Sequence, residues 1–245
     1  MDLSYYALSA LAVLIALAIH EYSHAYAAYK LGDNTAKNLG RLTLNPLKHL
    51  DPIGTICMIL FHVGWAKPVP INARNFKDPK KGFAISALAG PAVNIAAAFL
   101  SALIYRIMYV SLRDVMFAPE SFALSFWSNM LLFVFLFHAI NLGLGLFNLL
   151  PFPPFDGSRI LHLVLPSKIY FGIMKYERKI YWVVLAWLFL GDSLTNLLRA
   201  IPLIANSPFL YSIVGIFALS DMLGAGITAI SNLMFSFWEI FPILR

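Results

Sequence analysis

Three long apolar runs dominate the hydrophobic pattern of this chain. They extend from Leu3 to about Tyr29, from Gly82 to about Val110 and from Phe122 to Leu150. Each exceeds the roughly 20 apolar residues that a helix needs to cross a bilayer. The pattern therefore predicts three transmembrane helices in the first two thirds of the chain.

Two further apolar stretches follow, Tyr181 to Ala205 and Pro208 to Phe241, and both are interrupted by polar residues, proline or glycine. One long tilted helix or two short segments fit each stretch, so we expect one to three further spans here. The fold class predicted is an all-α polytopic membrane protein with about five to six transmembrane segments.

The connection from Lys30 to Lys81 is the most polar part of the chain. Within it, Asp51 to Val63 has an apolar core too short to span a bilayer, which favours an interfacial or re-entrant segment. The prolines between Gly64 and Asn72 exclude a helix interior and favour extended chain or an edge strand. We therefore predict a short extended, β-like, membrane-associated loop near residues 61–76.

Composition and charge support the membrane assignment. Hydrophobic residues make up 60% of the 245 residues and charged residues only 12%, against about 25% charged in an average soluble domain. The net charge of +6 arises from two basic connections rather than an amphipathic soluble face, so the expected partner is the lipid bilayer and not nucleic acid. Because basic connections stay in the cytoplasm, the chain is predicted to be a multi-pass cell-membrane protein with its N-terminus outside.

The first apolar run contains the motif His20-Glu21-Tyr22-Ser23-His24. Residues four apart lie one turn apart on the same helix face, so both imidazoles can reach one tetrahedral ion. Glu21 lies beside that face, where it can take a proton from a metal-bound water. Since ionisable side chains inside a membrane segment are costly, the motif predicts a zinc site near the cytoplasmic face.

A third ligand is needed, because catalytic zinc sites have three protein ligands and one open position. Cys57 is the only cysteine, which excludes an intrachain disulfide and a cysteine-based zinc site. Asp156 is the one carboxylate between Glu120 and Glu177, and it follows the third apolar run. Its alternative role is that of a turn aspartate bonded to its own backbone, but the pair of histidines favours Asp156 as the third ligand.

Other polar residues within or near the spans have simpler alternatives. Asn94 must find a partner at membrane depth, either in an interhelical hydrogen bond or at the site. His138 is expected to make an interhelical hydrogen bond rather than bind metal. His49 and His162 lie in or near connections, and we expect both to be solvated.

Together, three motifs resemble the site-2 protease family of intramembrane zinc metalloproteases. They are the His-Glu-x-x-His motif, Gly90-Pro91-x-x-Asn94, and the Asn-Leu-Leu-Pro-x-Pro-x-x-Asp-Gly pattern from Asn148 to Gly157. The loop from Gly64 to Asn72 is similar to the small prokaryotic branch, without a PDZ insertion or a CBS domain. The resemblance covers about Leu3 to Leu165.

The resemblance implies one zinc ion per chain, held by His20, His24 and Asp156, with Glu21 as the catalytic base. It also implies that Asn148 helps to stabilise the oxyanion and that a transmembrane protein substrate pairs with the extended loop around Asn72. Asn94 is a further candidate for substrate binding. On this interpretation residues 1–245 form one transmembrane peptidase domain, with a catalytic core over about 3–165 and C-terminal spans over about 180–241.

Two other functions compete with this hypothesis. Membrane proteases of the prenyl-protein type also use a His-Glu-x-x-His motif, but their third ligand is a downstream glutamate, and no later glutamate here lies in a matching helical motif. A metal transporter or an inactive zinc-binding scaffold would place acidic residues and histidines along an ion path through several spans. The candidate residues here converge at one depth instead.

Overall fold

The computed structural model describes residues 3–61, 65–113, 122–215, 219–241 and 243, and in these ranges all regular structure is helical. The bridge between Leu50 and Ala66 is the one β contact within them. The helices are α1 (Leu3–Lys30), α2 (Thr35–Asn38), η1 (Pro46–Lys48), α3 (Pro52–Phe61), η2 (Ala73–Asn75), α4 (Pro79–Ser111), α6 (Phe122–Asn148), α7 (Gly157–Val164), α8 (Ser167–Met174), α9 (Glu177–Arg199), α10 (Pro202–Ala205), α11 (Pro208–Gly215) and α12 (Leu219–Trp238).

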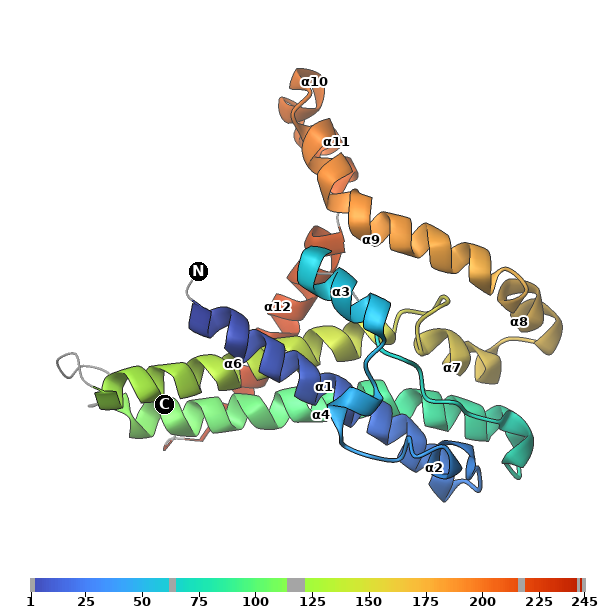
Figure 1. The fold of residues 1–245 in the computed structure, drawn as a ribbon. Coiled ribbons are helices and arrows are strands. Elements are labelled where there is room, and N and C mark those ends of the chain that lie inside the picture. The colour runs from blue at the N-terminus through green and yellow to red at the C-terminus, as the bar shows by residue number, and fades with distance from the viewer. Residues whose placement is uncertain (1–2, 62–64, 114–121, 216–218, 242, 244–245) are drawn as a thin grey trace.

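A bundle of α1, α4 and α6 forms the centre of the fold (Figure 1). Helices α1 and α6 run in the same direction and α4 runs against them. All three are long and apolar enough to cross a membrane, which confirms the three long helices predicted from hydropathy. Small residues fill the contact surfaces, among them the fully buried Ala12, Ala16 and Ala98, and they let the helix backbones approach closely.

In the C-terminal part, the described residues hold at most one of the one to three further spans predicted. Helix α9 is a candidate span only if its two halves, which bend by 49°, count as one, so the described residues hold three or up to four candidate spans instead of five or six. Prolines at the starts of α10 and α11 divide the following apolar residues into short helices, because proline fits the first turn of a helix but not its interior. In Figure 1, α9 to α11 project away from the bundle, whereas α12 returns to pack against α4 and α6.

The predicted extended loop is present in part. From Trp65 to Asn72 the chain forms neither helix nor strand, and η2 follows. Pro68 and Pro70 have no N–H to donate to a ladder, which explains why the pairing stops after the Ala66 bridge. His62, which precedes the predicted extended segment in the sequence, lies outside the described part of the chain, as do residues 63 and 64.

Three of the other histidine predictions can be compared with the structure. His162, which we expected to be solvated, is only partly exposed, and its ring stacks on Tyr170 with the ring centroids 4.1 Å apart. His138 makes the expected interhelical contacts, since its Nδ1 donates to the Ala98 carbonyl and its Nε2 contacts Ser231 Oγ, both at 2.8 Å. The expectation for His49 was wrong: the side chain is 1% exposed, and its Nε2 donates to the Thr43 carbonyl at 2.8 Å. The bridge beside it folds the basic connection back on itself and so buries the ring.

Hydrogen bonds to Asp33 connect the extended segment before η2 to the end of α1. Its buried carboxylate accepts hydrogen bonds from the Asn72 N–H and the Asn75 Nδ2, both at 2.7 Å, and from the backbone and hydroxyl of Thr35. Burial raises the pKa of Asp33, but these donors stabilise the charged form more and bring the pKa below its ordinary value of 3.8. Asp33 is therefore charged when it binds the loop.

We expect Asp33→Asn to lower the free energy of unfolding by about 2 kcal/mol at neutral pH, the usual size for hydrogen bonds to a charged group. Because the folded state lowers the pKa, this contribution is present above the ordinary value of 3.8 and is lost as the pH falls below it. Thermal unfolding of both proteins in detergent measures this difference. A gap in melting temperature that stays constant into the acid range would contradict the assignment.

Candidate metal centre

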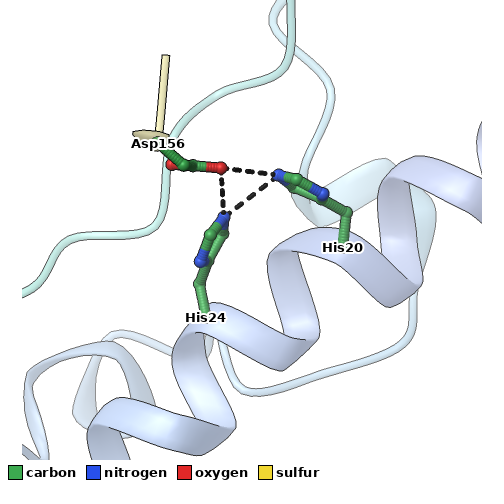
Figure 2. A group of neighbouring side chains, drawn as sticks. All are labelled: His20, His24 and Asp156. Carbon is green, nitrogen blue, oxygen red and sulfur yellow. Dashed lines mark hydrogen bonds and ion pairs between the residues drawn. The ribbon is translucent and has the colours of Figure 1, made fainter. Parts of the chain in front are cut away.

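Side chains from two separate parts of the chain meet at one point, where each of them offers a metal-ligating atom (Figure 2). His20 Nε2 lies 3.0 Å from His24 Nε2, and Asp156 Oδ2 lies 3.2 and 3.1 Å from these two nitrogens. Two ligands at about 2.0–2.1 Å from a tetrahedral zinc are about 3.3 Å apart. The three atoms thus have nearly the spacing of a zinc coordination shell.

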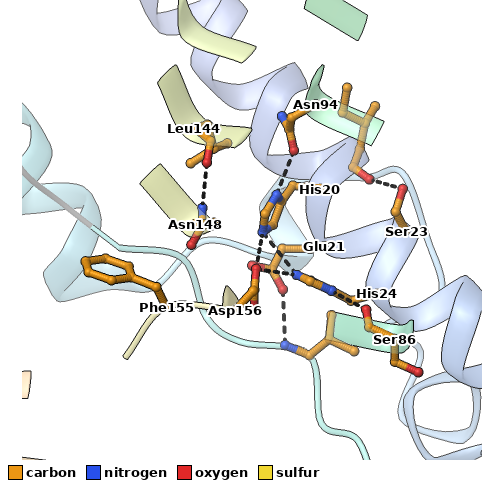
Figure 3. Close-up of polar contacts among 12 residues, drawn as sticks. His20, Glu21, Ser23, His24, Ser86, Asn94, Leu144, Asn148, Phe155 and Asp156 are labelled. Carbon is orange, nitrogen blue, oxygen red and sulfur yellow. Dashed lines mark hydrogen bonds and ion pairs between the residues drawn. The ribbon is translucent and has the colours of Figure 1, made fainter. Parts of the chain in front are cut away.

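The hydrogen bonds of the two imidazoles determine which nitrogens carry protons. His20 Nδ1 faces Asn94 Oδ1 at 2.6 Å, and His24 Nδ1 faces the carbonyl of Ser86 at 2.7 Å (Figure 3). The carbonyl can only accept, and the Asn94 amide is oriented by its Nδ2, which donates to Asn141 Oδ1 at 2.7 Å. Both Nδ1 atoms are therefore donors, and each neutral ring turns an unprotonated Nε2 toward the centre.

Three acceptor atoms consequently face one another with no proton between them. Asp156 Oδ2 is buried and accepts no hydrogen bond. Since unpaired acceptors are costly in a buried place, this donor set fits a bound cation.

Helix α4 supports the histidines from behind. Asn94 is fully buried, and its Nδ2 also donates to the Ala16 carbonyl of α1 at 3.3 Å. It thus connects α1, α4 and α6 while it orients the His20 ring. Gly90 lies on the same part of α4, and a Cβ built there would be 2.4 Å from His24 Nε2 and 2.8 Å from His20 Cε1. Only glycine lets α4 approach the two rings this closely.

Asp156 reaches the centre because the chain breaks after α6. The helix ends at Asn148, a proline-rich segment follows, and α7 begins at Gly157. A Cβ on Gly157 would lie 2.3 Å from the carbonyl oxygen of Leu149, so the turn requires glycine. This turn brings Asp156 next to the two histidines, which lie about 130 residues earlier in the sequence.

A cavity of about 670 Å³ opens over the three ligand atoms and is lined by Glu21, Asn148 and Val69 as well. Glu21 is 7% exposed, and its Oε2 accepts a hydrogen bond from the Val69 N–H at 3.1 Å. Asn148 Nδ2 donates to the Leu144 carbonyl at 3.0 Å. The predicted base and the predicted oxyanion donor thus face the same space as the ligand group.

The structure does not bring Asn94 and Asn72 to this cavity. Asn94 lies behind His20 and turns all of its polar atoms to the protein. Asn72 accepts a hydrogen bond from the Arg74 N–H with its side chain and donates one to Asp33 with its backbone. Asp51, Arg159 and Tyr181 do line the cavity, and no motif in the sequence indicated them.

Comparison with known proteins identifies the chain. The sequence model described as Peptidase family M50 matches residues 8–191. The chain belongs to this family. This match confirms the resemblance to the site-2 proteases. It also confirms the prediction that the chain is a zinc metallopeptidase.

Several curated proteins are similar to this M50 peptidase. "Putative zinc metalloprotease YwhC" of Bacillus subtilis (strain 168) is 41% identical over 157 residues, which cover 64% of this chain and 68% of YwhC. "Putative zinc metalloprotease Rip2" of Mycolicibacterium smegmatis is 29% identical over 149 residues, 59% of this chain and 52% of Rip2. "Putative zinc metalloprotease MJ0611" of Methanocaldococcus jannaschii is 34% identical over 110 residues, 44% of this chain and 49% of MJ0611. The chain thus spans only about half the length of Rip2 and MJ0611. No solved structure matches it.

Gly90 gives this M50 peptidase a simple test of the metal centre. We expect Gly90→Ala to weaken zinc binding by about tenfold or more, because the added methyl group displaces the His24 ring. Alanine is a better helix former than glycine, so unfolding of α4 would not explain the loss. The control is Gly224→Ala on α12, where a Cβ meets nothing within 4 Å. Competition with a zinc chelator measures both affinities, and equal affinity in the two variants would contradict the geometry.

Proposed function

We propose that this M50 peptidase hydrolyses peptide bonds within or near the membrane-spanning segments of other proteins, with one zinc ion held by His20, His24 and Asp156. The observation that carries the proposal is the convergence of three unprotonated acceptor atoms, at 3.0 to 3.2 Å from one another, beside a buried glutamate. A zinc ion bound there would supply a polarised water with a pKa near 7.

Glu21 acts as the general base and then as the general acid. Its Oε2 is oriented by the Val69 N–H, and its other oxygen is free of that bond and can take the proton of the attacking water. The same carboxyl group then returns the proton to the leaving amine.

Asn148 stabilises the oxyanion. One hydrogen of its Nδ2 is used by the Leu144 carbonyl, and the second can be donated to the developing charge. One such donor is typically worth about 3 kcal/mol in the transition state. Asn94, although expected at the substrate, is proposed to act through His20 by holding the ring in the tautomer that exposes Nε2.

The substrate enters in an unwound form, because the carbonyls of a helix are engaged in its own hydrogen bonds. The segment from Pro68 to Asn72 supports pairing with extended substrate chain mainly through its carbonyls and the Ile71 N–H. Pro68 and Pro70 have no N–H, and the amides of Val69 and Asn72 already bond Glu21 and Asp33. Contact between Asn72 and the substrate remains a prediction.

The basic connections support a cytoplasmic placement of the site, with the N-terminus outside. A single group of three metal-ligating residues exists among the described residues, whereas an ion path would need several. We therefore favour the protease over the transporter.

Proteoliposomes that contain the purified protein and a labelled single-span substrate distinguish these functions. We expect zinc-dependent cleavage, its loss on chelation, its recovery with zinc, and no zinc flux. Zinc flux without cleavage would overturn the proposal in favour of a transporter.

A further inference from the structure

A second cavity of about 390 Å³ lies beside the metal centre, between α1, α3, α6 and α12. Among the described residues that line it, only Thr55 and Trp65 carry polar side-chain atoms. The Thr55 hydroxyl already donates to the Asp51 carbonyl at 2.7 Å. The remaining lining residues are aliphatic, phenylalanine or glycine. Such a surface accepts an apolar occupant and offers little to a polar one.

This second cavity, called the groove below, is continuous with the cavity over the metal centre. Leu17, Trp65, Leu144 and Phe147 line both spaces. Leu17 lies one helical turn before Glu21 on α1, and Leu144 lies one turn before Asn148 on α6. The groove therefore begins directly beside the proposed catalytic side chains.

From there the groove follows the bundle away from the metal centre. Val13 lies a further turn back on α1, and Ile140 a further turn back on α6. Because α1 and α6 run in the same direction (Figure 1), these residues lead from the catalytic groups toward the middle of both candidate spans. On the proposed function, a substrate chain drawn out of the membrane would arrive from this side.

We propose that this groove is a specificity subsite, which binds a large apolar side chain of the substrate on the membrane side of the cleaved bond. The proposal rests on the proposed function above. One helical turn is about 5.4 Å, and extended chain advances about 3.3 Å per residue, so the groove is reached about two residues from the cleaved bond. A cavity of 150 Å³ can hold benzene, so the volume here accommodates leucine, phenylalanine or a larger group.

Gly143 is the position in the groove at which a side chain can be added. A Cβ built on it meets only Ile227 Cδ1, at 3.7 Å, which is an ordinary contact. We expect Gly143→Phe to lower kcat/KM at least about tenfold for a substrate with leucine at the subsite position, and to leave a substrate with alanine there little changed. The control is Gly226→Phe on α12, where a Cβ meets nothing within 4 Å, and it should leave both substrates unaffected. An equal fall for both substrates, with zinc content retained, would overturn the subsite.

Cross-linking tests the same contact without catalysis. Cys57 is the only native cysteine, so Cys57→Ala combined with Gly143→Cys and Glu21→Gln gives a single reactive thiol in the groove. Substrates with one cysteine at successive positions should cross-link most strongly about two residues from the cleaved bond on its membrane side. A signal that is flat along the substrate, while the wild-type protein cuts, would overturn the subsite alone. Position-dependent cross-linking without any cleavage by the wild type would instead overturn the proposed function. If neither position-dependent cross-linking nor cleavage is seen, the subsite and the proposed function are both overturned.

Discussion

Replacement of Glu21 by glutamine is expected to lower the rate of cleavage about 10³-fold, the middle of the range for a lost general acid–base group. Glutamine has nearly the same shape and can still accept the Val69 N–H bond, but it cannot take a proton from water. Its side chain is also not part of the ligand group, so bound zinc should be unchanged. Single-turnover cleavage of a reconstituted substrate, with zinc measured on the same sample, tests both statements.

The matched control is Glu239→Gln, the same chemical change at a side chain that pairs with Arg106 at 3.2 Å and does not line the cavity. It should retain activity. If the Glu21 variant cuts at the wild-type rate, another group is the base and the mechanism is wrong. If it loses both cleavage and zinc, Glu21 has a structural role instead.

Asp156→Asn is expected to lower the affinity for zinc by more than about 100-fold. Loss of a residue that merely orients a ligand typically costs 10- to 100-fold in metal affinity, and Asp156 provides one of only three ligand atoms. The charge lost is also the one that balances the cation in a buried place. Zinc titration of the metal-free protein measures the effect.

Asp51→Asn is the matched control, because Asp51 lines the same cavity without belonging to the ligand group. Its amide oxygen can still accept the Gly54 N–H bond, which the native carboxylate accepts at 2.8 Å. We expect full zinc affinity in this variant. Unchanged affinity in Asp156→Asn would mean that the third ligand lies elsewhere, as in the prenyl-protein type of protease.

Much of the site could be predicted from the sequence because its chemistry is local. The spacing of His20 and His24 fixes both rings on one helix face, and Glu21 follows from the same motif. Asp156 was predictable because acidic residues are so scarce near the third span. The three long helices followed from hydropathy, which needs no tertiary information.

The remaining features depend on how the helices are rotated against one another. Asn94 could have faced the cavity, and only the packing of α4 against α1 turns it to His20. The described residues hold three to four candidate spans against the five to six predicted, because hydropathy alone does not reveal that short helices begin at Pro202 and Pro208. The groove beside the metal centre combines residues from five separate stretches of the sequence, so no single stretch indicates it.

The most direct test of the central claim is to map the new chain ends after cleavage. The zinc-loaded protein and a single-span substrate are reconstituted together, and mass spectrometry identifies the product termini. We predict one main cut inside the span or at its edge, on the face of the membrane that holds His20 and Asp156, and none with Glu21→Gln. An intact substrate, or cuts only in the soluble flanking regions, would contradict the account.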